Sequence, residues 1–323
     1  DKSNTNWCNT AGKAGGMRKE ENMKFETFME TVTVKVQEIA GADASVHVHE
    51  VRKNNNVLLH GMTILRKGQN VSPTIYLDGF FDMLKEGLDM EYIVRKILEV
   101  YVRGLPRDKV DMEFFRDYER VRERIVYRLV NREKNAELLT DIPHVDFLDL
   151  SICFCYSYEH PELGEGMILI HNNHVEMWKT CHRELMRLAE RNTPRLMPAR
   201  LCGMDLALKE ILEEEALEEL RQLQQETGKY LHVLSNEKRC QGAAAILYPG
   251  VLAEAAGRLR GSFYILPSSI HEVILLQDDG RGHGEGLHEM IAEINRSQLR
   301  EEEVLSDYAY RYDAVTGKIK EVL

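Results

Sequence analysis

The densest group of residues that could do chemistry is Pro267-Ser268-Ser269-Ile270-His271-Glu272, which separates two apolar stretches. Nucleophilic catalysis needs a hydroxyl, a base within hydrogen-bond reach and a carboxylate that orients the base. Ser268, Ser269, His271 and Glu272 supply all three groups. They are adjacent in sequence, however, whereas such triads normally assemble from separate segments, and no Gly-x-Ser-x-Gly motif surrounds them. The cluster predicts either a hydrolase site or a connection between strands whose hydroxyls bond to backbone groups.

A second group could hold a metal ion. Its members are His171, His174, Cys181 and His182, and zinc accepts both imidazole and thiolate ligands. The chain has no Cys-x-x-Cys or His-Glu-x-x-His pattern, and His174 and Cys181 are poorly spaced to share one ion from a single helix. We therefore expect no metal and no other cofactor. If the protein does bind a metal ion, these four residues are the candidate ligands.

Composition limits the class of protein. The chain has 323 residues, of which 43% are hydrophobic and 29% charged, as in globular proteins. Its formal net charge of -11 argues against general nucleic-acid binding, because phosphate neutralisation needs clustered Lys and Arg. No apolar run approaches the roughly 20 residues that span a bilayer. The 6 cysteines are scattered, which is typical of a reducing compartment, so we expect a cytoplasmic protein.

The spacing of apolar residues and turn residues predicts helices mixed with hairpins. Helices are expected over 24–40, after Asp78, after Asp89, and over 113–130, 175–191, 205–228 and 287–299. Strands are expected at a hairpin that turns at 53–56, over 145–158 with 167–171, at 195–201, over 230–234 with 239–247, over 263–266 with 273–276, and at a C-terminal hairpin that turns at 316–317. Because hairpins and helices do not strictly alternate, we expect an α+β fold of mixed, largely antiparallel sheets with packed helices.

The chain is expected to contain two regions behind a polar start. Residues 1–22 are Gly-rich and polar, and we expect a disordered tail, a vector-derived remnant or an upstream extension of the reading frame. An N-terminal α+β region is expected over 23–140 and a C-terminal α+β region over 141–323. One continuous domain over both is the alternative.

Three blocks of sequence resemble a known family. They are VRKNNNVLLHGMTI with SPTIYLDGFFDMLKEG; ELLTDIPHVDFLDLSICF; and LHVLSNEKRCQGAAAILYPGVLAEAAGRLRGSFYILPSSIHEVILLQDD. Together they resemble the bacterial family called domain of unknown function 5688, found in Firmicutes of gut type, over nearly all of residues 23–323. The resemblance implies a bacterial cytoplasmic protein and brings no established activity, cofactor or catalytic residue.

Function is therefore open between three classes. The first is a non-enzymatic accessory or regulatory protein that binds a protein or a small ligand. The second is a hydrolase that uses Ser268 or Ser269 with His271 and Glu272. The third is a metal-dependent enzyme that uses the region 171–182. Nothing in the sequence names a substrate, a partner or an oligomeric state.

Overall fold

The computed structural model describes residues 23–106, 113–160, 164–209, 213–227, 230–278, 280 and 286–322. The tail expected at 1–22 lies outside these residues. Contacts divide the described residues into two compact units. The first contains 23–53, 58–106, 160 and 164, and the second contains 54–57, 113–159 and the remainder from 165 onward. The boundary expected from the sequence lies between residues 140 and 141, whereas the main boundary between the two units lies between residues 112 and 113.

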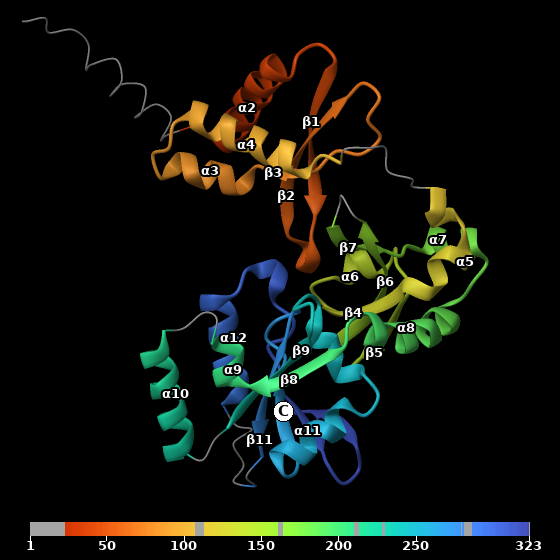
Figure 1. Ribbon diagram of the computed structural model, residues 1–323, viewed down its shortest axis with the longest axis vertical. Helices are drawn as coiled ribbons and strands as arrows, with labels where there is room; N and C mark the ends of the chain where they lie inside the picture. The colour runs from red at the N-terminus through yellow and green to blue at the C-terminus, as the bar shows by residue number, and fades with distance from the viewer. Residues whose placement is uncertain are drawn as a thin grey trace, which may run out of the picture. The chain divides into compact units, whose positions relative to one another are not determined.

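The described residues of the first unit form a three-stranded antiparallel sheet packed against three helices. Its elements are α2 (Phe25–Ala40), β1 (Ala44–Arg52), β2 (Leu58–Arg66), β3 (Ile75–Tyr76), α3 (Asp78–Lys85) and α4 (Met90–Gly104). Figure 1 shows the three helices gathered beside the β1–β2 hairpin. The expected helix over 24–40 and the expected hairpin are both confirmed.

Local signals explain why these elements form. Helix α2 buries Phe28, Val32 and Val36, which recur every four residues on one face. It ends at Gly41, whose φ of 82° suits a residue without a side chain. Helix α4 begins after Asp89, whose carboxylate accepts a 2.8 Å hydrogen bond from the backbone N–H of Tyr92.

The described residues of the second unit form two sheets. One has four strands, in which β6 pairs with each of the others: β4 (Ile125–Asn131), β5 (His144–Phe147), β6 (Leu150–His160) and β7 (Gly164–Leu169). The other has six antiparallel strands in the order β13-β12-β10-β11-β9-β8. Its strands are β8 (Ala199–Gly203), β9 (Leu231–Asn236), β10 (Phe263–Leu266), β11 (Val273–Gln277), β12 (Tyr310–Asp313) and β13 (Lys318–Glu321).

Helices of the second unit are mostly short. The α-helices are α5 (Tyr118–Val121), α6 (Ala136–Leu139), α7 (Asn172–Trp178), α8 (His182–Leu196), α9 (Met204–Leu208), α10 (Glu214–Thr227), α11 (Val251–Leu259) and α12 (Leu287–Gln298). The 3-10 helices are η1 (Asn54–Asn56), η2 (Glu113–Arg116), η3 (Arg122–Arg124), η4 (Gly242–Leu247) and η5 (Glu301–Glu303). Among the described residues, no helix is both long and apolar enough to cross a membrane.

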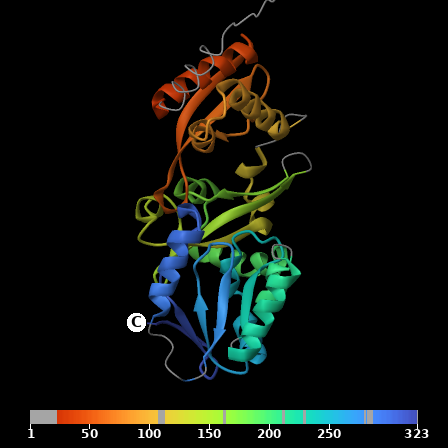
Figure 2. The ribbon, with the colours of Figure 1, turned by 90° about the vertical axis from the view of Figure 1, so that its left-hand side faces the viewer.

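The six-stranded sheet is covered differently on its two faces. Residues such as Leu234, Val273 and Leu275 pack with η4 and α11 in the main core of the second unit. Tyr264 and Leu266 belong to the opposite face, where they pack with Leu287 and Ile291 of α12. In Figures 1 and 2 the helices α9, α10 and α12 lie on this second side of the sheet. The expected α+β fold with antiparallel sheets and packed helices is confirmed.

The helix predicted over 113–130 is wrong. Only short helical turns occupy 113–124, and Ile125–Asn131 forms strand β4. Ile125, Val126 and Tyr127 are all fully buried, although successive residues of a strand point to opposite faces. Burial on both faces suits a continuous run of β-branched and aromatic residues, and this packing outweighs a helical spacing of charges.

The strand predicted over 239–247 is also wrong, because Gly242–Leu247 forms the 3-10 helix η4. Strand β9 pairs instead with β8 and β11. Gly242 lies so close to Ser235 and to the carbonyl oxygen of His271 that a Cβ atom would collide with both. This close approach is a long-range contact, so no local pattern indicates it.

Several predicted elements are divided in the structure. The strand expected over 145–158 is β5 and β6, separated by a turn at Leu148, whose φ is 55°. The helix expected over 175–191 is α7 and α8, separated at Lys179, whose φ is 52°. The helix expected over 205–228 is described as α9 and α10, and 210–212 lie outside the described residues.

Asparagines of η1 are tied to the C-terminal part of the second unit. Asn55 is only 5% exposed and has a left-handed backbone, with φ 59°. Its side-chain amide donates 2.7 Å hydrogen bonds to the carbonyl oxygens of Glu301 and Val304. Its side-chain oxygen accepts a 2.9 Å bond from Asn135, whose own oxygen accepts from the Asn55 N–H. A buried polar group needs such partners, so this pair stabilises the fold.

We predict that Asn55→Ala lowers the free energy of unfolding by about 3 kcal/mol, because it removes the donor to the buried Val304 carbonyl and the side-chain partner of the buried Asn135, and places Ala in a left-handed conformation. Urea unfolding followed by the fluorescence of the buried Trp178, with Trp7 replaced by Phe in every protein, measures the change.

Asn172→Ala is the control, since the side-chain amide of Asn172 donates one solvent-exposed hydrogen bond, to the Thr140 carbonyl. Equal stability of the two variants would contradict the prediction.

Candidate functional site

The Ser-Ser-Ile-His-Glu cluster is the connection between β10 and β11, as the sequence predicts for its second alternative. Backbone hydrogen bonds tie it to a later segment. Leu305 N–H donates to the Ser268 carbonyl at 2.8 Å, and Ile270 N–H donates to the Glu303 carbonyl at 2.9 Å. Ser269 also forms an isolated β-bridge with Val304. The connection is therefore paired almost like a strand.

The side chains of this cluster do not form a relay. Ser269 is 4% exposed, and its hydroxyl oxygen accepts a 3.0 Å bond from the backbone N–H of His271. The Nδ1 atom of His271 accepts from the backbone N–H of Gln241 at 3.4 Å, and its Nε2 atom lies 3.8 Å from a carboxylate oxygen of Glu303. Among the described residues, neither Ser268 nor Ser269 is hydrogen-bonded to the imidazole. Hydrolysis by these residues stays a prediction.

The four metal-ligand candidates lie at the beginnings of two helices. The backbone N–H of His171 donates to Nδ1 of His174 at 3.0 Å, which caps the start of α7. The His174 ring packs edge-on against Phe115, with centroids 5.0 Å apart, and burial lowers its pKa. Cys181 and His182 are exposed at the start of α8. The described part of the chain has no group of three or more His, Cys, Asp or Glu residues arranged to hold a metal ion.

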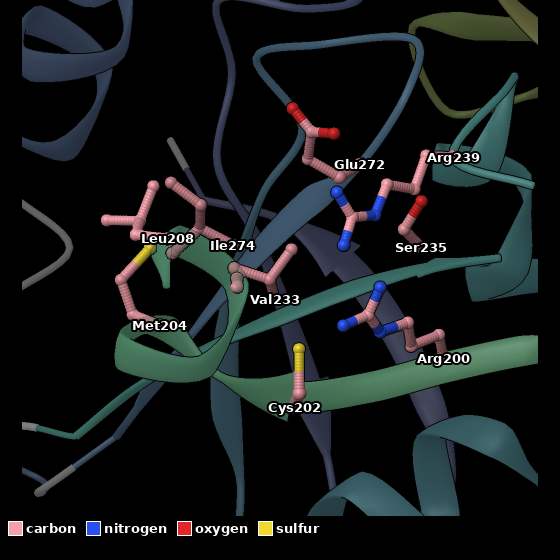
Figure 3. Close-up of a pocket in the computed structure, with 10 residues that line it drawn as sticks. Arg200, Cys202, Met204, Leu208, Val233, Ser235, Arg239, Glu272 and Ile274 are labelled. Atoms are coloured by element: carbon pink, nitrogen blue, oxygen red, sulfur yellow. The ribbon is translucent and has the colours of Figure 1, made fainter. Parts of the chain in front are cut away.

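A pocket of about 310 Å³ lies on one face of the six-stranded sheet, beside α9 (Figure 3). Its lining combines basic, acidic and apolar side chains: Arg200, Cys202, Met204, Ala207, Leu208, Val233, Ser235, Arg239, Glu272 and Ile274. Glu272 belongs to the cluster that the sequence singles out. The size and the mixed lining are those of small-molecule sites, which are apolar with a few placed polar groups.

Strand register explains why these residues meet. Val233 of β9 is paired with Cys202 of β8 and with Ile274 of β11, so the three side chains share one face. Arg200 is paired with Ser235 in the same way. Met204, Ala207 and Leu208 of α9 complete the apolar part of the lining.

Charges are concentrated at one end of this pocket. Figure 3 shows the Arg200 and Arg239 guanidinium groups and the Glu272 carboxylate on the side away from Met204 and Leu208. Burial raises the pKa of Glu272, and the nearby Glu303 carboxylate adds to this effect, whereas His271 and Arg239 oppose it. The Ser235 hydroxyl donates a 2.7 Å hydrogen bond to the carbonyl oxygen of His271, so this hydroxyl is not available to donate to another group.

Sequence reasoning missed most of this site. Arg200 and Cys202 lie within or next to the edge strand predicted at 195–201, and Arg239 follows β9. The alternation of Arg200 and Cys202 with Leu201 is the local signal that could have indicated a shared face. Their convergence with Glu272 depends on pairing between strands that are distant in sequence.

We predict that Glu272→Gln gains stability relative to the natural protein as pH rises from 4 to 7. The folded pKa of Glu272 is raised above the ordinary value of 4.5, so the stabilising effect of its proton is lost as pH rises through the folded pKa. Glutamine keeps the shape and does not titrate, so the variant avoids this loss. Urea unfolding at closely spaced pH values measures the difference between the two proteins.

Glu237→Gln is the matched control, because Glu237 is exposed and its replacement makes the same change in net charge. The slope for Glu272→Gln is interpreted after the slope for this control is subtracted. After this correction, the variant should gain stability over the natural protein as pH rises. A difference in free energy of unfolding that is constant with pH, or that falls as pH rises, would show that burial does not raise the pKa of Glu272.

Comparisons with known proteins identify the chain by family. The model described as "Family of unknown function (DUF5688)" matches residues 25–314. Searches of curated proteins and of solved structures found no match. The match covers both compact units, from helix α2 to strand β12. The chain therefore belongs to the DUF5688 family of unknown function.

Proposed function

We propose that this protein binds a small organic ligand in the pocket formed by β8, β9, β11 and α9, and that it is a non-enzymatic accessory or regulatory protein. We further propose that it acts in the cytoplasm of a bacterium, which is what the family resemblance implies. One observation carries the proposal. An apolar floor and wall meet two guanidinium groups and a carboxylate around a single pocket of about 310 Å³.

The chemistry of the lining supports binding more than catalysis. A nucleophilic enzyme needs a hydroxyl or thiol beside a base. The Ser235 hydroxyl donates to a backbone carbonyl. Among the described residues, no hydrogen bond joins the Cys202 thiol to the Glu272 carboxylate, which is the lining group that could act as a base. Arginine stays protonated at physiological pH, so Arg200 and Arg239 can attract a ligand but cannot take its proton.

The position of the pocket also supports a binding function. It is built mainly on three neighbouring strands, whose opposite faces are held by the buried core of the second unit. Side chains on paired strands keep their positions better than side chains on loops. Such a site is pre-organised, which lowers the entropic cost of binding.

A fragment screen by ligand-observed NMR tests the proposal. We predict that fragments bind the natural protein and that Ala207→Trp weakens them about tenfold or more, because the indole fills the pocket beside α9. Leu206→Trp is the matched control, since Leu206 is the neighbouring residue of the same helix and is 54% exposed.

Thermal unfolding establishes that both tryptophan variants are folded. Fragments that bind the natural protein and Leu206→Trp equally, and Ala207→Trp much more weakly, would support the proposal. A screen without binders, or binders that Ala207→Trp does not affect, would overturn it.

A further inference from the structure

The Arg200 guanidinium is an available positive charge in the pocket. Arg200 is partly buried on the edge strand β8 and projects from the same face as Val233 and Ile274 (Figure 3). Among the described residues, its side chain has no hydrogen bond and no ion pair. A guanidinium presents several N–H donors in a plane that matches a carboxylate group. Arg200 is therefore suited to hold an anion.

Glu272 and Arg239 interact electrostatically at the same end of the pocket. The positive charge of Arg239 acts to lower the pKa of Glu272, so the two groups lie within electrostatic reach. Arg200, by contrast, has no hydrogen bond or ion pair among the described residues, so its charge is available to a ligand. A ligand with one negative charge balances it. A zwitterion is less suited, because an ammonium group placed near Glu272 would also lie within electrostatic reach of the positive charge of Arg239, which repels it.

Apolar side chains define the other part of the ligand. Val233 and Ile274 form the floor, and Met204, Ala207 and Leu208 form the wall beside them. In Figure 3, Met204 and Leu208 lie on the opposite side of Val233 from Arg239 and Ser235. A ligand that occupies the whole pocket therefore needs an anionic head and an aliphatic body, which gains affinity by leaving water.

Resting on the proposed function, we infer that the ligand is a small aliphatic monocarboxylic acid whose carboxylate binds Arg200 and whose hydrocarbon part covers Val233 and Ile274. The acid keeps its negative charge at physiological pH, because an ordinary carboxyl group titrates near pH 4. No covalent step is involved.

Four compounds with related branched skeletons test the inference by calorimetry: 4-methylpentanoate, 4-methylpentan-1-ol, L-leucine and 3-methylbutylamine. We expect 4-methylpentanoate to bind tightest, at least about tenfold better than the alcohol, since a charge-assisted hydrogen bond is replaced by a neutral one. Its affinity is expected to fall as sodium chloride is added, whereas that of the alcohol is not, because salt screens charge.

Arg200→Gln keeps a polar side chain of similar length and removes the charge. We expect it to weaken 4-methylpentanoate about tenfold and to leave the alcohol within about twofold. Arg183→Gln is the control, because Arg183 is exposed on α8 and does not line the pocket. It is expected to change neither affinity.

Where the compounds bind, three results would overturn the inference. They are tighter binding of L-leucine than of 4-methylpentanoate, equal binding of acid and alcohol, and an acid affinity that Arg200→Gln does not change. Fragments could still bind the natural protein, and bind Ala207→Trp more weakly, when none of the four compounds binds. In that case the inferred ligand class is wrong and the proposed binding function stands. If neither the compounds nor the fragments bind, the binding function fails as well.

Discussion

The alternation of side chains along β8, β9 and β11 is the constraint on which the pocket and the core of the second unit both depend. Successive residues of a strand point to opposite faces, so Leu234 and Val273 enter the core while Val233 and Ile274 form the pocket floor. A shift of one residue in register would exchange the two faces. The apolar core therefore decides which side chains can reach a ligand.

Register also explains how polar groups are tolerated at this face. Arg200 lies on the edge strand, where an arginine can cover apolar neighbours with its alkyl stem and keep its charged end near water. Glu272 precedes a central strand and is more confined, which is why burial raises its pKa. A fully buried carboxylate would need a partner, and the charge of Arg239 meets part of that need.

Elements that depend on local signals could be predicted from the sequence. Helix α2 has its apolar stripe and its terminal glycine, the β1–β2 hairpin has its run of asparagines, and β10 and β11 are short apolar runs around a polar turn. Strand β4 and helix η4 could not be predicted, because their conformations depend on burial and on the contact of Gly242 with a distant backbone. Local propensity is a weak guide where tertiary packing opposes it.

The same distinction applies to the candidate site. The residues from Ser268 to Glu272 are adjacent in the sequence and their types suit catalysis, so a sequence pattern singles them out. Arg200 and Arg239 meet only after the strands pair, so no sequence pattern indicates this convergence. Side-chain contacts distinguish a catalytic cluster from a structural connection. The Ser269 hydroxyl and the His271 ring form hydrogen bonds with backbone groups rather than with each other.

Those backbone bonds nevertheless affect the pocket. The bond from His271 N–H to the Ser269 hydroxyl closes a tight turn before β11, and the His271 carbonyl then accepts from Ser235 on β9. Glu272 follows directly and precedes Val273, which is paired with Leu234. A connection held at both of these points has little freedom, so the carboxylate of Glu272 is placed at the pocket by bonds that other residues of the cluster make. The polar cluster thus contributes to the site chiefly by fixing backbone conformation, and only Glu272 among its members lines the pocket.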